Sequence, residues 1–294
     1  MSGGILIAAW LVAGCGDDPA INHDSGGRDA NDAPADAIAD TLDVFHDTSR
    51  DGDEGGAAIA PWIEEDFSSY ASTADLLADR RGVYSVAEDV ATNQMFLDTT
   101  TGVESLGLTR SMRYDYLAPG CSSQTVGRNL VLPASAAEVW VELHVKLSRN
   151  FSVANIEGCA TPPSFKFLFG RLTPDGWCRF SLGVLGPEQR WALAAAGCSN
   201  TDDFPPTPSA TEIYDERWHS IRVHWRVGTP DGQNSAVETW IDGTSIYRRS
   251  DFDAGGTPSI YGLALGRNLD QGIPTGTMSL WWGRVRVWNE DPGW

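Results

Sequence analysis

Lysine is almost missing from this chain. Only Lys146 and Lys166 occur in 294 residues, and 40 Asp and Glu outnumber 21 Lys and Arg, which gives a formal net charge of −19. A surface this acidic repels phosphate groups, which argues against nucleic acids and anionic membrane surfaces as partners. No segment beyond the N-terminus stays apolar for the roughly 20 residues that a transmembrane helix needs.

Motifs for metals and common nucleophiles are also missing. None of the five cysteines has a CxxC spacing or a histidine at ligand spacing, so we expect no zinc site. Glycine-rich phosphate loops are absent, and no Ser-His-Asp arrangement can be argued from the order of residues. The Asp-rich stretch from Asp47 to Glu54 does not match the twelve-residue calcium loop. We therefore expect no cofactor and no metal, and calcium binding is left open by the sequence.

A short apolar run opens the chain. Ile5 to Val12 contains no charge and is followed by Ala13, Gly14 and Cys15. The run is too short to span a bilayer and has the length of a signal-peptide core. The stretch resembles a bacterial lipobox, which implies cleavage before Cys15 and lipidation of its thiol. The mature protein would then be an exported bacterial lipoprotein, held by acyl chains at the outer membrane or cell surface.

The next segment differs sharply in composition from the rest. Residues 16–60 hold twelve Asp or Glu and two Arg, a net charge of −10; residues 1–15 carry no charged side chain, so −9 is left for residues 61–294. Repulsion between these charges and the lack of apolar surface predict a disordered acidic tether. The expected organisation is a signal peptide over 1–15, a linker over 16–60 and one folded domain over 61–294.

The folded part is dominated by a period of two, which predicts strands. Residues 139–147 place Val139, Val141, Leu143, Val145 and Leu147 on one face and Trp140, Glu142, His144 and Lys146 on a solvated face. Residues 221–227 repeat this pattern, and Asp242-Gly243 predicts a tight turn between two further strands. Helix is expected only over residues 72–80. The pattern favours an all-β sandwich of antiparallel sheets.

Three stretches carry a resemblance to a known family. They are residues 65–70, residues 218–223 followed by 237–243, and the closing residues 281–288. Together they look like the concanavalin A-like jelly roll shared by laminin-G-type modules, legume-type lectins, laminarinase-type hydrolases and jelly-roll polysaccharide lyases. The resemblance covers nearly all of residues 61–294 and implies a jelly-roll sandwich, but this fold hosts binding proteins and enzymes alike.

The enzymatic members of that family are matched poorly. The laminarinase-type Glu-x-Asp-x-Glu triplet is absent, which argues against a glycosidase. The lyase motifs would fall on residues 111–116, 165–169 and 260–268. There Arg113 could neutralise a uronate, Lys166 lies near the glutamine position, Leu168 occupies the histidine position, and the third segment keeps Asn268 without the expected tyrosine.

Binding requires fewer groups than catalysis, because aromatic faces and planar polar side chains are enough to hold a sugar. Trp177 and Trp191 are expected to be exposed, whereas Trp225 and Trp240 are expected to be structural. Arg113, Lys166, Arg179 and Arg267 could line a groove for an acidic sugar. His144 and His224 are expected to be solvated, and His219 could be a packing residue.

These observations favour a membrane-anchored, surface-exposed jelly-roll domain that binds a polysaccharide or cell-envelope glycan without catalysis. The alternative is a polysaccharide lyase acting on an acidic polysaccharide, and a third possibility is a structural lipoprotein with no small ligand.

The four remaining cysteines suggest two disulfides in an exported chain, with three possible connectivities. Turns over 173–176 and 186–189 predict strands 177–185 and 190–196, which would form a hairpin whose paired residue numbers sum to about 375. Cys178 would then lie one position out of register with Cys198, which a bulge or a slightly longer turn would correct. This favours the pairs Cys178–Cys198 and Cys121–Cys159. A Cys159–Cys178 pair would instead indicate a different strand order, and the alternative of four free buried thiols is disfavoured by an exported location.

Overall fold

The structure is a computed structural model. It describes residues 59–79, 94–116, 123–125, 127–153, 164–172, 179–185, 189–196, 202–203, 209–229, 232, 234–254, 259–266, 268–270 and 277–294. Residues 56–294 form one structural unit. The predicted signal peptide lies outside the described residues, as does the predicted tether apart from Ile59 and Ala60.

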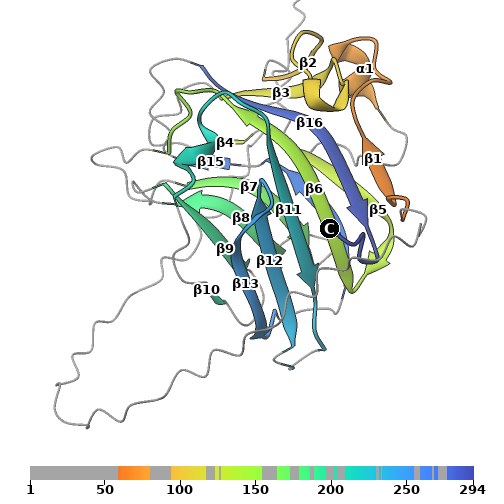
Figure 1. Ribbon diagram of the computed structural model, residues 1–294, viewed down its shortest axis with the longest axis vertical. Helices are drawn as coiled ribbons and strands as arrows, with labels where there is room; N and C mark the ends of the chain where they lie inside the picture. The colour runs from red at the N-terminus through yellow and green to blue at the C-terminus, as the bar shows by residue number, and fades with distance from the viewer. Residues whose placement is uncertain are drawn as a thin grey trace, which may run out of the picture. The chain divides into compact units, whose positions relative to one another are not determined.

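Two eight-stranded antiparallel sheets build this unit (Figure 1). In the first, here called sheet A, the strands are ordered β13-β12-β11-β6-β16-β3-β2, and β1 also pairs with β16. The bounds of its strands are β1 Ile63–Glu65, β2 Met95–Asp98, β3 Ser111–Tyr116, β6 Glu138–Leu147, β11 His219–Arg226, β12 Ser235–Ile241, β13 Thr244–Phe252 and β16 Met278–Trp288.

The second sheet, sheet B, follows the order β10-β9-β8-β7-β14-β5, with β15 joined to β4 and β7. The bounds of its strands are β4 Ser123–Thr125, β5 Arg128–Ala136, β7 Ser164–Arg171, β8 Arg179–Leu185, β9 Arg190–Ala196, β10 Asp202–Asp203, β14 Ile260–Leu265 and β15 Asn268–Asp270. The predicted all-β architecture of two antiparallel sheets is therefore confirmed.

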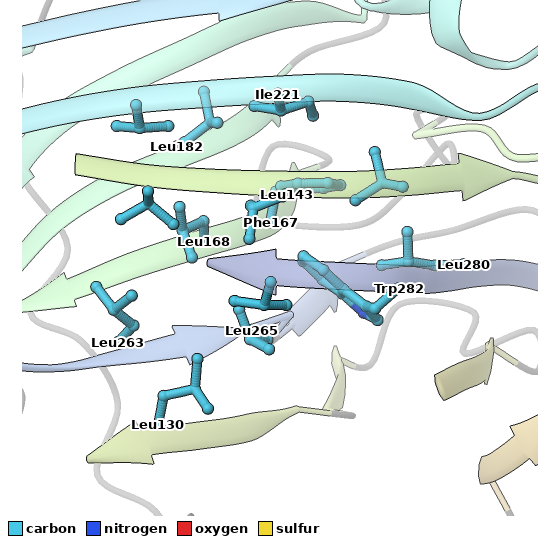
Figure 2. Packing of buried hydrophobic residues seen from close by; sticks show 14 of the residues in the cluster. Leu130, Leu143, Phe167, Leu168, Leu182, Ile221, Leu263, Leu265, Leu280 and Trp282 are labelled. Carbon is cyan, nitrogen blue, oxygen red and sulfur yellow. The ribbon is translucent and has the colours of Figure 1, made fainter. Parts of the chain in front are cut away.

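The hydrophobic core lies between the two sheets, as the alternation along β6 predicts. The five apolar residues from Val139 to Leu147 are at most 1% exposed, and Ile221, Val223 and Trp225 on β11 are fully buried. Figure 2 shows Leu143, Ile221, Leu280 and Trp282 of sheet A facing side chains of sheet B that include Phe167, Leu168, Leu182 and Leu263. Burial of each such large apolar side chain stabilises the fold by about 1.5–3 kcal/mol.

Local sequence signals fix two of the hairpins. Asp242 and Gly243 both have positive φ, at 49° and 79°, between Ile241 and Thr244, which pair with each other. This is the backbone that a two-residue turn of the predicted kind requires. Strands β8 and β9 pair from Arg179 with Ala196 through Leu185 with Arg190, so the paired numbers sum to 375 and the predicted register is confirmed.

The one described α-helix, α1 Thr73–Ala78, begins where the sequence predicts. The Ser72 hydroxyl accepts a hydrogen bond from the Asp75 amide at 3.2 Å, which satisfies one of the free amides of the first turn. Leu76 is fully buried and packs the helix onto the core. Two 3-10 helices, η1 Glu104–Leu106 and η2 Thr211–Ile213, lie in connections between strands.

Candidate functional site

The outer faces of the two sheets differ in charge. Strands β5, β7, β8, β9 and β14 of sheet B contain no Asp or Glu, although the chain as a whole is strongly acidic. They contain five cationic residues, and Arg128 is the one of these that is buried, against α1. The other four, Lys166, Arg171, Arg179 and Arg190, are here called the basic strip.

The basic strip faces away from the core. On β7, Phe165 and Phe167 pack inward against each other and against aromatic residues of the core, so Lys166 between them lies on the outer side. Arg171 and Arg179 lie directly opposite each other in the β7–β8 ladder. Like charges opposite each other in a sheet disfavour pairing, and two such cations side by side attract anionic groups.

Small residues lie beside these cations. Gly183 pairs with Lys166, and Gly262 pairs with Arg171. Both glycines are needed for close backbone approach, since a Cβ on Gly183 would lie 2.6 Å from the Phe165 carbonyl oxygen. The two glycines therefore let the neighbouring strands approach closely beside the cations.

Phe169 gives the strip an aromatic component. Its ring belongs to the outer face of β7 and is 6% exposed, and the Arg179 guanidinium carbon lies 4.9 Å from its centroid. This cation–π contact holds the Arg179 charge over a fixed point of the sheet. Planar guanidinium groups suit bidentate recognition of carboxylates.

The structure brings together only part of the predicted groove. Lys166 and Arg179 share the outer face of sheet B, but Arg113 lies on β3 of sheet A and turns away from the core on that side of the sandwich. Arg113 ion pairs with Asp115 at 3.0 Å and with Asp98 at 3.6 Å. The prediction that Arg113 and Lys166 line one groove is therefore wrong, because the two residues belong to different sheets.

Trp191 is a second correction. It is 3% exposed and packs edge-on against Phe167 at a centroid distance of 6.1 Å, so its predicted exposure is wrong. It pairs with Val184, and this register places its side chain on the core side of β9. Trp225 is fully buried, as predicted, and Trp240 is half-buried.

Other predicted site residues cannot be placed. Trp177, Arg267 and the five cysteines Cys15, Cys121, Cys159, Cys178 and Cys198 lie outside the described residues, and only the backbone of Asn268 is described, in β15.

The three segments aligned with lyase motifs are divided between the two sheets, like the residues of the predicted groove. The second and third, on β7 and β14, are neighbours, with Ala264 paired to Phe169. The first segment is β3, in sheet A. At the histidine position, Leu168 is fully buried in the core after a bulge in β7, so no imidazole stands there.

Sequence reasoning missed Arg171, Arg190 and Phe169. A usable signal was present, because five strand segments contain no acid at all although the chain is strongly acidic. That signal becomes visible only when the strands are assigned to one sheet.

The outer face of sheet A is also charged, and it carries a network of ion pairs. Glu142, predicted to be solvated, is 2% exposed beneath three arginines. Its carboxylate accepts hydrogen bonds from Arg222 at 3.1 Å, from Arg286 at 2.9 Å and from Arg284 at 3.4 Å. Burial alone would raise the pKa of Glu142, but its bonds to Arg286 outweigh burial and hold that pKa below its ordinary value.

The histidines of sheet A are also more buried than predicted. Burial lowers the pKa of His144 to about 4, and the neighbouring arginines add to this effect against the opposing charge of Glu142. His224 stacks on Trp140 at 4.7 Å and its Nε2 lies 2.7 Å from Glu138. His219 is 5% exposed, which agrees with a packing role. These contacts indicate that this network stabilises the sheet.

Two negative findings apply to the described part of the chain. No cluster of three or more His, Cys, Asp or Glu side chains there could hold a metal ion. Within the same residues, every helix is too short or too polar to cross a membrane.

Comparisons with known proteins agree with the fold. No protein-family model matches the chain, and no curated protein matches it in sequence. Among solved structures, the alginate lyase Aly36B is 10% identical with a TM-score of 0.53, over 78% of this chain and 98% of that chain. A variant of the same lyase in complex with alginate trisaccharide gives 11% identity and a TM-score of 0.53, over 80% and 100% of the two chains.

An endo-β-1,4-glucuronan lyase from the fungus Trichoderma reesei is 12% identical over 63% of this chain and 85% of that chain, with a TM-score of 0.45. At these identities the likeness concerns the fold. The two antiparallel sheets and the likeness to Aly36B together show that the folded unit adopts a concanavalin A-like jelly-roll sandwich.

Proposed function

We propose that this domain binds an acidic polysaccharide along the basic strip of sheet B and acts on it as a polysaccharide lyase. The observation that carries the proposal is the absence of Asp and Glu from β5, β7, β8, β9 and β14, with Lys166, Arg171, Arg179 and Arg190 on three adjacent strands; the acidic residues of the sheet's strands lie on β10 and β15. A polyuronate presents one carboxylate per sugar along an extended chain, so a row of cations can bind several units at once. The fold likeness to an alginate lyase supports this choice of polymer.

Lyase chemistry requires three roles at the cleaved unit. A cation neutralises the uronate carboxylate, a base removes the proton beside it, and an acid protonates the leaving glycosidic oxygen, which leaves a C4–C5 double bond. Arg171 and Arg179 suit the first role, since a charged pair next to the carboxylate stabilises the enolate-like transition state.

Tyr261 is the best candidate for proton transfer. It is the one tyrosine on the described strands of sheet B, is half-buried, and precedes Gly262, which pairs with Arg171. A phenol can act as acid or base. Tyr261 lies on β14, which pairs with β7, so it is one strand away from Arg171 and two strands away from Arg179.

A second candidate function is binding without catalysis. It is favoured by the buried Leu168 at the position where the lyase motif has histidine, and by the lack of histidine on the described strands of sheet B. In this case the basic strip holds the polysaccharide and no bond is cleaved.

One assay separates the two functions. The purified protein is incubated with polymannuronate, polyguluronate, polyglucuronate or polygalacturonate, and both binding and the ultraviolet absorbance of the unsaturated product are followed. A lyase gives the absorbance, and Tyr261→Phe abolishes it while binding persists. Binding to a polyuronate with no product supports the second function, and absence of binding to all four polymers overturns both.

The N-terminal apolar run bears on where the protein is located. We infer that Cys15 carries the lipid that anchors the domain at the outer membrane or cell surface, on the ground of the apolar run and small residues before it. Mass spectrometry of the native N-terminus should show an acylated cysteine, which Cys15→Ser should remove. An unprocessed Met1 on the native protein would contradict this location.

A further inference from the structure

A cavity of about 320 Å³ opens at one end of sheet A, on the outer side. It lies in the size range of small-molecule sites. Lys146 on β6 contributes to it, together with the loop that follows β2 and the loop that precedes β11. Its lining includes Thr100, Thr101, Glu104, Lys146, Glu216 and Trp218.

The wall after β2 is held in place by one carboxylate. Asp98 accepts hydrogen bonds from the amides of Thr100 and Thr101 at 2.9 and 3.0 Å, and from the Trp281 indole at 2.9 Å. Burial opposes ionisation of Asp98, but these donors outweigh it and lower its pKa to about 2. The hydroxyl-bearing wall of the cavity is therefore preorganised.

The opposite wall is held as firmly and contains a strained residue. Glu216 has a φ of 63°, in the left-handed region that non-glycine residues rarely adopt. Its neighbour Asp215 accepts from the Arg217 amide at 2.9 Å and lies 2.9 Å from Nε2 of His219. Nδ1 of His219 in turn lies 2.7 Å from Asp242 in the β12–β13 turn. Such strain persists only where surrounding contacts enforce it, and it is concentrated at binding sites.

Trp218 also lines the cavity, and its ring packs against Gly283 of β16. A Cβ on Gly283 would lie 2.9 Å from the Trp218 ring and 2.1 Å from the Val103 side chain. Gly283 falls at a bulge between Trp282 and Arg284. The bulge and the glycine together leave room for an aromatic side chain at the cavity wall.

The cavity lining contains two cationic and two acidic side chains, so its formal charges cancel. Neither Glu104 nor Lys146 forms an ion pair within the described residues, and the Lys146 ammonium lies 5.2 Å from the centre of the Trp281 ring. Glu216 and Arg217 add one charge of each sign, and each is paired with a residue outside the lining, Glu216 with Arg149 at 3.4 Å and Arg217 with Asp215. A lining with equal numbers of cations and carboxylates favours neither a polyanion nor a polycation, but it offers donors and acceptors that suit hydroxyl groups.

We propose that this cavity is a second glycan site, which binds one pyranose unit of a neutral sugar. The carboxylate of Glu104 and the ammonium of Lys146 hydrogen-bond its hydroxyls, and Trp218 contacts its apolar face. The site belongs to the other sheet from the basic strip. It therefore stands independently of the function proposed for sheet B.

The test uses the full chain and saturation-transfer NMR with methyl pyranosides of glucose, galactose and mannose, with cellobiose, and with glucuronate as a charged comparator. At least one neutral sugar should bind, and glucuronate should bind less. Lys146→Met and Glu104→Gln should each weaken binding about tenfold, the loss expected for one charge-assisted hydrogen bond. Arg226→Met, which removes an exposed cation from the same sheet, should leave binding unchanged.

Three results would overturn the proposal: no binding of any neutral sugar, tighter binding of glucuronate, or binding that survives both cavity variants. Because Glu104 is exposed, Glu104→Gln should not disturb the fold. This variant therefore tests the site even where circular dichroism shows that Lys146→Met does not fold. Polyuronate binding should be equal in the wild type and both variants, which separates this site from sheet B.

Discussion

The guanidinium carbon of Arg179 lies 4.9 Å from the centre of the Phe169 ring, on the outer face of sheet B. The ring comes from β7 and the guanidinium from β8, so the contact joins two neighbouring strands. A side chain fixed in this way loses little further entropy when it binds an anion. Arg179 is therefore the cation of the basic strip from which we expect the largest single effect.

Arg179→Met should weaken binding of a polyuronate about tenfold, because it removes one charge-assisted hydrogen bond of about 1.5 kcal/mol and keeps much of the side-chain volume. The measurement is isothermal titration with a polyuronate fragment. The affinity of the wild type should fall as salt is added, since screening weakens exposed ionic contacts.

Arg226→Met serves as the matched control, because Arg226 is an exposed cation at the end of β11 in sheet A. Equal losses in the two variants would mean that overall charge, rather than the basic strip, drives binding.

Glu142→Gln should destabilise the fold by about 2–3 kcal/mol. It leaves Arg222, Arg284 and Arg286 close together without the buried carboxylate that joins them. The arginine side chains are 16–32% exposed, so the loss should stay below the 3–5 kcal/mol typical of a fully buried pair. Urea unfolding measures it, with exposed Glu290→Gln as the control; a loss no larger than that of the control would show that the cluster contributes no stability.

The free energy of unfolding should decrease as the pH is lowered, over a pH range set by the pKa of His144. Its folded-state pKa of about 4 lies below its ordinary value of 6.5, so the folded protein binds fewer protons than the unfolded chain in between. The stability that the neutral His144 side chain contributes is complete above about pH 6.5, and it is lost as the pH falls toward 4. His144→Gln should flatten that part of a plot of unfolding free energy against pH. Identical slopes in the two proteins would exclude His144 as the cause.

The disulfide pairs Cys178–Cys198 and Cys121–Cys159 stay predictions, since all four residues lie outside the described part of the chain. The register of β8 and β9 pairs Arg179 with Ala196, which agrees with the basis of the first pair. Peptide mapping without reduction should find both bridges. A Cys159–Cys178 peptide would contradict the assignment.

Alternation predicts individual strands well, because it depends on neighbours in sequence. The faces of β6 and β11 follow from it, and so does the hairpin of β8 and β9. That hairpin register also carried the signal for Trp191: residues 184 and 191 pair, so both must lie on the core side with Leu182. Applied to the whole strand, the register would have corrected the predicted exposure.

Membership of a sheet depends on distant pairings that alternation does not encode. Arg113 and Lys166 both stand at outward positions of their strands, yet β3 pairs with β16 and β7 pairs with β14 and β8. A bulge likewise turns two successive residues, Phe167 and Leu168, toward the core. The predicted groove of Arg113 and Lys166 failed for this reason.

The position of β16 has a consequence for the order of assembly. This strand, Met278–Trp288, follows all the other described strands in sequence, yet it lies between β6 and β3 and also pairs with β1. Before it emerges, β6 lacks one of its two partners and β3 cannot join sheet A. Sheet A therefore cannot close until residues 278–288 are in place, after every other described strand of the unit. A protein released without its last strand should be degraded or aggregate rather than accumulate as a smaller domain.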